Sequence, residues 1–211
     1  MRLINVMASS LDARIGVHKR EGDDERQSVG LSNAKDQELL RRHMEGAEAI
    51  IVGATSIHAN GSCLDHPGKG HKPPIWYIYA RSPIPEHYEF WKQTHIPRVI
   101  VSANPLPLVP GSGVENLLYR KSEPASFIHG HMKSKGIETA LLFGGGVVNS
   151  WFYEQGLVDQ LELTLAPIML GKADAPFLIA PQLSRAVQFL LVSSQVSENF
   201  VFLSYSVATI G

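Results

Sequence analysis

The sequence contains a single cysteine, Cys63, among 211 residues. A disulfide within the chain is therefore impossible, and a zinc site built on several thiolates has no support. Low cysteine usage fits a reducing compartment, so we expect a cytoplasmic protein. Cys63 lies in the stretch GSCLDHP with His58 and His66 nearby, and a nucleophilic cysteine is a minor hypothesis that stays open.

The chain also lacks a large net charge of either sign and any long apolar run. Its 19 basic and 20 acidic residues give a net charge of −1, so nucleic acid binding has no global electrostatic support. No apolar run approaches the roughly 18 residues of a membrane span. The start, MRLINVMASSLD, lacks the apolar core and cleavage site of a secretory signal. We expect a small-molecule partner, with any anion held by local groups.

What the sequence does contain is a hydrophobic fraction of 44%, enough for the core of one large domain. Short apolar runs alternate with helical patterns about four times, and two or three strand patterns without helices follow. This order predicts parallel crossover connections first and antiparallel strands last. We predict a single-domain α/β fold over 1–211, with a mixed, mainly parallel sheet of about eight strands flanked by helices and a C-terminal antiparallel hairpin.

The individual elements follow from periodicity and capping signals. The predicted strands are 2–9, 48–53, 75–79, 98–102, 138–143, 160–170 and a closing hairpin of 186–197 with 199–208. The first predicted helix begins after an N-cap at Ser32 or Asn33 and ends near residue 45. The other predicted helices are 54–59, 86–92, 122–135 and 147–155. Segments 18–30, 60–74 and 103–113 are predicted loops, the first of them mobile. The alternation in 160–170 is typical of an exposed antiparallel strand.

Three consecutive glycines, Gly144, Gly145 and Gly146, separate a buried strand from a helix in the stretch LLFGGGVV. In α/β sheets, ligands bind outside the carboxyl ends of the strands, where free N–H groups and the positive helix end point outward. Glycine would let a diphosphate approach the main chain closely. A tight turn that needs glycine only for its backbone conformation explains the triplet equally well.

A second strand-to-helix turn has a similar composition, because Gly53 ends a strand and is followed by Thr55 and Ser56. Arg81 and Ser102 follow the next two predicted strands, so the same edge of the sheet carries them. Two such turns in one sheet favour a dinucleotide that lies across the carboxyl edge. Arg81 is a candidate for binding a 2′-phosphate, because a guanidinium pairs well with phosphate oxygens.

Taken together, these motifs resemble the pyrimidine reductase domain of riboflavin biosynthesis, the RibD C-terminal type, which has a dihydrofolate-reductase-like fold. Three stretches carry the resemblance in chain order: MASSLDARIG, AEAIIVGATSIHANG and LLFGGGVVNSWFYEQGLVDQLELTLAPIMLG. The C-terminal hairpin also fits. The zinc deaminase that often precedes this domain needs an H-x-E motif paired with a P-C-x-x-C motif, and this sequence, with its single cysteine, has no such pair.

The resemblance implies an NADPH-dependent reductase, commonly a homodimer, that transfers hydride to a C=N bond of a heterocyclic substrate. In the riboflavin enzymes the acceptor is the ribosyl imine of an aminopyrimidine phosphate. No catalytic residue and no metal site are assigned. In the broader fold the loop of Ile15 and Gly16 covers the nicotinamide. The remaining positions implied for the cofactor are Ala8, Gly53, Thr55, Ser56, Arg81, Ser102, Gly144, Gly145, Gly146 and Val147.

The substrate side departs from the family pattern. Where the family reads D-D-P-x-L-T-V-R, this chain has Asn60 in place of an acid and Pro67 in place of the terminal arginine. Phe143 replaces the glutamate before the glycines, and phenylalanine cannot accept hydrogen bonds from ring N–H groups. The basic residues available to replace the missing cation are Lys69, His71 and Lys72.

Two alternatives keep the cofactor and change the rest. A pterin or dihydrofolate reductase-like enzyme would need one carboxylate for its substrate, and Asp36 in the first helix roughly matches that place; its position also suits the helix dipole. A non-catalytic NADPH-binding homologue is the second. The candidate substrate-binding residues are therefore Ser32, Asp36, Asn60 and Phe143. Asp12, in the SLD motif, is expected to brace the nicotinamide loop.

Overall fold

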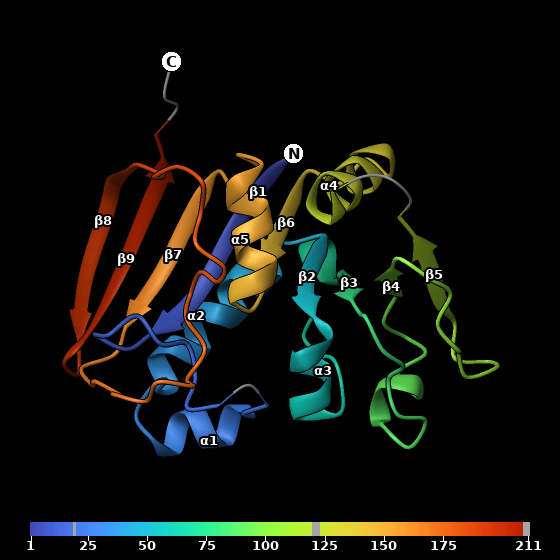
Figure 1. Cartoon of the computed structure of the whole chain (residues 1–211), viewed down its shortest axis with the longest axis horizontal. Coiled ribbons are helices and arrows are strands. Elements are labelled where there is room, and N and C mark those ends of the chain that lie inside the picture. The colour runs from blue at the N-terminus through green and yellow to red at the C-terminus, as the bar shows by residue number, and fades with distance from the viewer. Residues whose placement is uncertain (19, 120–122, 209–211) are drawn as a thin grey trace.

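A computed structural model describes residues 1–18, 20–119 and 123–208 (Figure 1). The strands are β1 Arg2–Ser9, β2 Ala49–Gly53, β3 Ile75–Tyr79, β4 Arg98–Ser102, β5 Val114–Leu118, β6 Thr139–Leu142, β7 Gln160–Leu165, β8 Phe189–Ser197 and β9 Phe200–Val207. The α-helices are α1 Asp23–Ser28, α2 Ala34–Glu45, α3 Ala54–Asn60, α4 Pro124–Ser134 and α5 Gly146–Glu154. Two 3₁₀ turns, η1 Lys69–His71 and η2 Glu89–Trp91, lie in the connections.

All strands of the described residues form one sheet in the order β5-β4-β3-β2-β6-β1-β7-β9-β8. The first seven in this order run parallel to one another, whereas β9 is antiparallel to β7 and β8 is antiparallel to β9. The predicted single-domain mixed sheet with a closing hairpin is confirmed. The described residues form nine strands rather than about eight.

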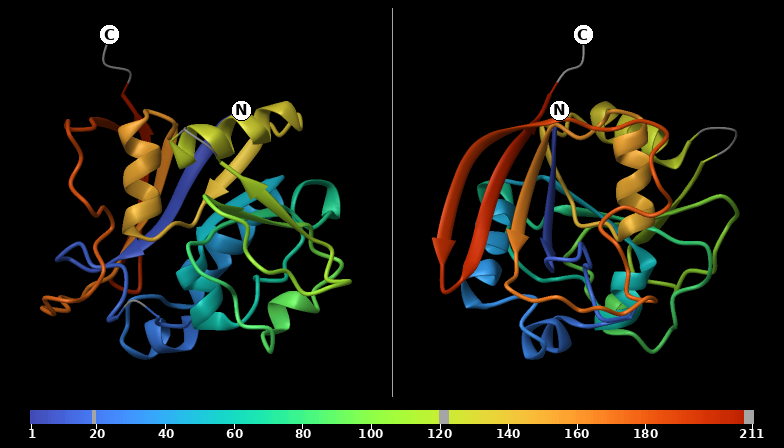
Figure 2. Two further views of the ribbon diagram at one scale, coloured as in Figure 1. Left: turned by 45° about the vertical axis from the view of Figure 1, so that its right-hand side comes forward. Right: turned by 60° about the vertical axis from the view of Figure 1, so that its left-hand side comes forward.

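Helices cover both faces of the parallel part of the sheet (Figures 1 and 2). The side chains of α4 and α5 pack into one core cluster with β2, β3 and β6, and those of α2 and α3 pack into a second cluster on the opposite face. Strands covered on both sides need apolar residues at every position rather than at alternate ones. The run Ala49 to Val52 is accordingly buried throughout.

Three sequence predictions were wrong in detail. The 18–30 segment, predicted as a mobile loop, contains the helix α1, whose acidic first turn favours the positive helix end. The helix predicted over 86–92 is only the short turn η2, in which Phe90 and Trp91 are both buried. The strand β5 was not predicted, because its sequence VENLL has neither clear alternation nor a continuous apolar run.

The strand predicted over 160–170 also differs from expectation. β7 ends at Leu165 and lies inside the sheet, parallel to β1 on one side and antiparallel to β9 on the other. Successive side chains of β7 point to opposite faces of the sheet, and Glu162 on one of these faces lies 3.8 Å from His43 of α2. The predicted helix start at Ser122 lies outside the described residues, and α4 is described from Pro124. Within the described ranges, no helix has the length and apolar character needed to cross a bilayer.

Candidate functional site

The two glycine-containing turns lie side by side at the carboxyl edge of the sheet. β2 and β6 are hydrogen-bonded neighbours in which Ile51 pairs with Leu142, so both chains leave the same edge together. The Phe143 N–H donates to the Ile51 carbonyl at 2.9 Å, which carries the pairing into the turn. On the far side of β2, Gly53 pairs with Tyr79 at the end of β3. The arrangement expected for a dinucleotide across this edge is therefore geometrically possible.

The three glycines of the triplet have different roles. A Cβ on Gly144 would lie 2.7 Å from Asn149 Oδ1, and one on Gly146 would lie 2.5 Å from the Phe177 carbonyl oxygen. Both positions therefore need glycine for the packing of the chain itself. A Cβ on Gly145 would meet nothing within 4 Å, so the space in front of this residue is open. Gly145 is also the N-cap of α5, where free N–H groups point outward.

A buried hydrogen-bond network between β1, α5 and the end of β6 stabilises this turn. The Asn5 side-chain amide of β1 donates to the Leu142 carbonyl at 2.8 Å, and the Tyr153 hydroxyl donates to Asn5 Oδ1 at 3.1 Å. Asn149 of α5 donates in turn to the Leu178 carbonyl at 2.9 Å. Burial raises the pKa of the Tyr153 hydroxyl, so it stays protonated as a donor. The network fixes α5 and the 177–180 segment against the end of β6.

A cavity of about 150 Å³ lies beside the turn, on the face covered by α2 and α3. Its floor comes from β1, β2, β3 and Phe143, which follows β6, and its walls come from the α1 segment, α2 and α3. Apolar side chains dominate the interior part of the lining, whereas charged side chains gather on α1 and α2. The lining includes Ala8, Glu21, Asp23, Arg26, Asp36, Ser56, Asn60, Trp76 and Phe143.

Three of the four candidate substrate residues line this cavity: Asp36, Asn60 and Phe143. Ser32 is buried beside it, and its hydroxyl donates to Asp36 Oδ2 at 2.6 Å. The Ser32 oxygen also accepts from the Gln37 side chain at 3.1 Å. Ser32 therefore acts on the cavity through Asp36, whose carboxylate it orients.

The candidate cofactor residues fall into two groups. Ala8 and Ser56 line the cavity, whereas Thr55, Arg81 and Val147 are exposed at the same edge of the sheet.

Ser102 differs from both groups because its side chain is buried. Its hydroxyl lies 2.7 Å from the Asn104 carbonyl and 3.1 Å from Asn116 Oδ1. This hydroxyl is therefore engaged within the protein.

The loop of Ile15 and Gly16 is tied to the segment around residue 170. The Ile15 N–H donates to the Pro176 carbonyl at 2.9 Å. The Asp12 carboxylate accepts from the Leu170 N–H at 3.0 Å and the Gly171 N–H at 2.9 Å. Hydrogen bonds from the Ser10 hydroxyl and from these amides lower the pKa of Asp12 to about 2. Asp12 thus braces this loop, in the place that the sequence indicated.

The lining residues that sequence reasoning missed include Glu21, Asp23, Arg26 and Trp76. The first three come from the 18–30 segment, where the run Asp-Asp-Glu after Gly22 is a usable helix-start signal. Trp76 is a buried residue of β3 whose indole N–H has no hydrogen-bond partner in the described part of the chain. Its ring meets Phe143 edge-on at 6.5 Å between centroids.

The basic residues considered as replacements for the missing cation lie elsewhere. Lys69 Nζ is 2.6 Å from Glu138 and 3.3 Å from Glu48, at the edge where β2 and β6 begin. His71 and Lys72 belong to the same connection. The cavity lies at the opposite edge, so Arg26 is the cation that the fold brings to it.

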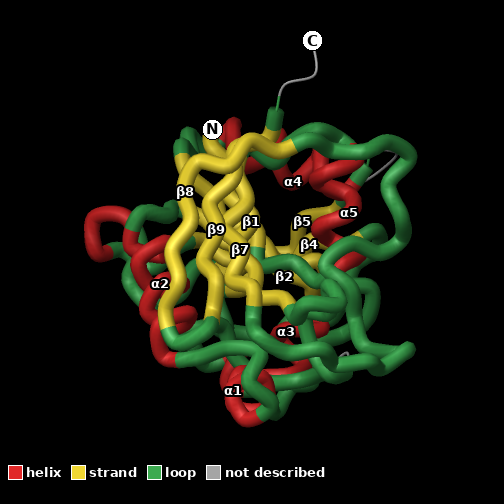
Figure 3. The backbone as a smooth tube through the Cα atoms, turned by 90° about the vertical axis from the view of Figure 1, so that its left-hand side faces the viewer, coloured by secondary structure: helices red, strands yellow, loops and turns green. Residues whose placement is uncertain are grey.

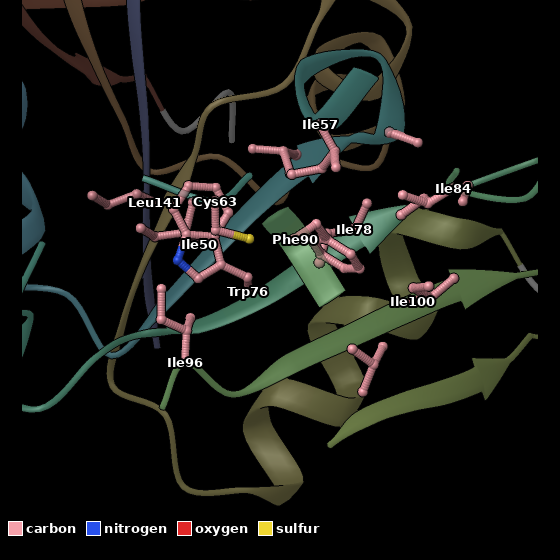
Figure 4. Close-up of a cluster of buried hydrophobic side chains, with 14 of the residues drawn as sticks. Ile50, Ile57, Cys63, Trp76, Ile78, Ile84, Phe90, Ile96, Ile100 and Leu141 are labelled. Carbon is pink, nitrogen blue, oxygen red and sulfur yellow. The ribbon is translucent and has the colours of Figure 1, made fainter. Parts of the chain in front are cut away.

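Cys63 lies inside the core and not at the site. Figure 4 shows its sulfur among Trp76, Ile50 and Phe90, and only 2% of the residue is exposed. Burial raises the pKa of the thiol to about 12, so the thiolate needed for nucleophilic attack does not form near neutral pH. This geometry argues against the hypothesis of a nucleophilic cysteine.

Comparisons with known proteins agree with this fold. The chain is similar over 98% of its length to a pyrimidine reductase-like protein from Corynebacterium diphtheriae, with 18% identity, 92% of that chain covered and a TM-score of 0.81. A deaminase/5-amino-6-(5-phosphoribosylamino)uracil reductase from Thermotoga maritima matches 98% of this chain, and the match covers 56% of that protein, with 18% identity and a TM-score of 0.77. A dihydrofolate reductase from Enterococcus faecalis gives 14% identity, a TM-score of 0.56 and coverage of 98% and 96%.

At these identities the solved structures establish the fold, which is of the dihydrofolate-reductase-like type. The family model described as RibD C-terminal domain matches residues 2–203, almost the whole chain. This match includes the glycine turn, the turn after β2 and the closing hairpin as far as residue 203. The protein therefore belongs to the RibD C-terminal domain family.

Proposed function

We propose that this protein is an NADPH-dependent reductase that transfers hydride to a C=N bond of a heterocyclic substrate, in the manner of the pyrimidine reductases of riboflavin biosynthesis. The observation that carries the proposal is the cavity that lies at the end of β1 and β6, next to the paired turns at Gly53 and Gly145. A hydride acceptor in this cavity would lie beside a dinucleotide that crosses the same edge.

The residues at this edge fit a dinucleotide. The open space in front of Gly145 would let a diphosphate approach its main chain. The exposed Thr55 follows β2, the strand next to β6. The exposed guanidinium of Arg81, after the next strand, suits a 2′-phosphate, which would favour NADPH over NADH. NADPH would supply the hydride, and the task of the chain is to orient the nicotinamide and exclude water. We assign that task to Ala8, which lines the cavity, and to the loop of Ile15 and Gly16.

The substrate side is built from carboxylates and apolar walls. Asp36 and Asp23 line the cavity together with Glu21, and Arg26 is the cation among them. Such a lining favours a ring that offers several N–H donors, as aminopyrimidines and pterins do. The indole N–H of Trp76, a residue of the lining, is buried and has no hydrogen-bond partner among the described residues.

The named relatives support the same chemistry. The Thermotoga maritima protein is a bifunctional deaminase and 5-amino-6-(5-phosphoribosylamino)uracil reductase, and the Enterococcus faecalis dihydrofolate reductase was solved with NADP(H). Asp36 favours a pterin or dihydrofolate as the second candidate substrate, because the Ser32 hydroxyl orients its carboxylate at the cavity wall. We place the enzyme in the cytoplasm, where the buried thiol of Cys63 stays reduced.

The test is NADPH oxidation with three acceptors: the phosphoribosylaminopyrimidine, dihydrofolate and dihydrobiopterin. The proposal predicts turnover of the aminopyrimidine with a kcat/KM at least about tenfold above the other two, a difference of about 1.4 kcal/mol. The reverse order would assign the enzyme to the pterin class. Tight NADPH binding without turnover of any of them would instead indicate a non-catalytic homologue.

A further inference from the structure

The cavity beside the glycine turn carries more acidic than basic residues. Glu21 before α1, Asp23 in the first turn of α1 and Asp36 of α2 all line it. Arg26 of α1 is the only basic residue in the described part of the lining. Three negative charges against one positive charge leave these four residues with a net charge of −2. A cavity with such a surplus repels anions and attracts cations.

The starts of α1 and α2 are unsuited to a phosphate. α1 and α3 lie next to each other beyond the carboxyl ends of β1 and β2 (Figures 1 and 3), and the Asp23 N–H of α1 lies 3.4 Å from Asn60 Oδ1 of α3. In α2, the Asp36 N–H donates to Asn33 Oδ1 at 2.9 Å. Phosphate binds a helix N-terminus through its free N–H groups, and the acidic first turns of α1 and α2 repel it. The start of α3 is different, because it lies at the turn that we assign to the dinucleotide.

The connection after α3 does not supply the missing cation. Ser62 and Leu64 of this connection line the cavity, and neither carries a charge. An arginine at position 67 could pair with a phosphate, whereas the proline of this chain cannot. Further along, Lys69 Nζ lies 2.6 Å from Glu138 Oε2 at the opposite edge of the sheet. The described part of the connection therefore leaves the charge of the cavity negative.

The remaining lining is suited to an uncharged ring. The ring of Trp76 meets that of Phe143 edge-on, with 6.5 Å between the centroids, and Trp76 is only 4% exposed. Val52 and Ile57 add further apolar surface. The cavity volume of about 150 Å³ is that of an apolar cavity that holds one benzene ring. A ring with amino groups would pack on these side chains and donate to the carboxylates, which as ions only accept hydrogen bonds.

We propose that the substrate is a heterocycle without a phosphate group, either neutral or positively charged. The inference rests on the proposed reductase function and specifies its substrate: a ribosylaminopyrimidine in preference to its 5′-phosphate. A phosphate monoester carries a charge of about −1.5 to −2 at pH 7, so it would meet a lining of the same sign. Placing like charges together is a recognised means of rejecting a ligand, and the amino groups of the ring still find acceptors in Asp23 and Asp36.

The test uses two substrates that differ only in the phosphate. A phosphatase converts the phosphoribosylaminopyrimidine to the ribosylaminopyrimidine, and NADPH oxidation is followed with each compound. We expect kcat/KM of the unphosphorylated form to be at least about tenfold higher. The ratio should fall as sodium chloride is raised to about 0.5 M, because salt screens the repulsion. Calorimetric titration of the two reduced products into the protein without NADPH should give the same order of affinities.

Two neighbouring aspartates of α1 provide a matched pair of variants. Asp23 lines the cavity, whereas Asp24 is exposed and lies outside the described lining. Both belong to the acidic first turn of α1, so either change removes the same favourable interaction with the helix end. Asp23→Asn should raise kcat/KM of the phosphorylated form, relative to the unphosphorylated form, at least about fivefold, and Asp24→Asn should leave this ratio within about twofold. Circular dichroism of both variants checks that they fold.

Equal kcat/KM for the two forms, or a higher value for the phosphorylated form, would overturn this inference while the reductase proposal stands. Equal effects of Asp23→Asn and Asp24→Asn would also overturn it, because the selection would then come from the charge of the whole surface and not from the cavity. If neither form is reduced, the reductase proposal fails and calorimetry alone decides the charge preference. Equal or tighter binding of the phosphorylated product, or no binding of either product, then contradicts the inference.

Discussion

The glycine turn and the neighbouring cavity meet at the same edge of the sheet, yet they are built in different ways. The turn is a main-chain structure that requires glycine at positions 144 and 146, because a Cβ there would come within 2.7 and 2.5 Å of other atoms of the protein. The cavity is a side-chain structure whose walls come from α1, α2, α3 and three strands. The turn is therefore constrained by the fold itself, whereas the cavity lining can change without altering the backbone.

This difference means that the lining of the cavity can be altered while the glycine turn is kept. Replacing Phe143 or Asn60 changes what the cavity can bind, and neither residue is held in place by a positive φ angle. Replacing Gly146 forces the 177–180 segment to move. The following variants are designed to separate the two regions, from the largest expected effect to the smallest.

Gly146→Val should cause the largest loss. Its side chain would collide with the Phe177 carbonyl and the Ala180 amide, and overpacking of this kind costs about 3 kcal/mol. Gly145→Ala is the control, because its Cβ enters open space and the change in stability should stay within about 1 kcal/mol. Urea unfolding measures both free energies. Similar losses at the two positions would show that the turn is not constrained as described.

Asp36→Asn tests the cavity alone. The amide keeps the shape and can still accept from Ser32, but it removes the negative charge that would hold ring N–H groups. Hydrogen bonds to a charged group contribute about 1.5–3 kcal/mol, so kcat/KM should fall about 10- to 150-fold. The dissociation constant of NADPH should change by less than about twofold. A large loss of NADPH affinity would indicate that Asp36 contacts the cofactor, which would contradict its assignment to the substrate cavity.

Arg81→Ala tests the cofactor edge without touching the cavity. Removal of an exposed cation next to a 2′-phosphate should weaken NADPH about tenfold, or about 1.4 kcal/mol. NADH lacks this phosphate, so its affinity should stay the same, and Arg81→Lys should recover part of the loss. Titration of both cofactors gives the ratio. Equal weakening of NADPH and NADH would exclude a 2′-phosphate contact.

Asp12→Asn should have the smallest effect, and one that depends on pH. The pKa of Asp12 is lowered to about 2 in the folded protein from 3.8, so its ionised form stabilises the fold above about pH 4. That contribution is lost as the pH falls through 2. The variant should therefore melt below the wild type at pH 6 and converge with it near pH 2. A constant difference in melting temperature across this range would contradict the assignment.

Much of the fold follows from the sequence because the central strands are continuous apolar runs between helix caps. Ile50 to Val52 and the glycines after Phe143 identify β2, β6 and their turns without tertiary information. β5 was not predicted because its pairing with β4, rather than its composition, makes it a strand. In this pairing Val99 of β4 lies beside Glu115 of β5. The edge strand thus depends on a neighbour that the sequence does not reveal.

The candidate site divides along the same line. Gly53 and Gly145 could be placed at one edge because parallel strands end together. Glu21 and Arg26 could not be assigned to the site from the sequence, because the charged composition of residues 18–30 is typical of a solvent-exposed loop. Only the structure shows that this segment forms a helix that lies next to α3. The hydrogen bond from Asp23 N to Asn60 Oδ1 at 3.4 Å is the contact that joins these two segments. Convergence of distant side chains on a cavity is a tertiary property.

The central claim is that a dinucleotide binds across the turns at residues 53–56 and 144–147. Amide hydrogen exchange of the wild-type protein with and without saturating NADPH tests it most directly. We expect slower exchange at Thr55 and at Gly145 to Val147, with the amides of β7, β8 and β9 unchanged. Protection confined to other segments, or exchange that NADPH leaves unaltered, would contradict the account.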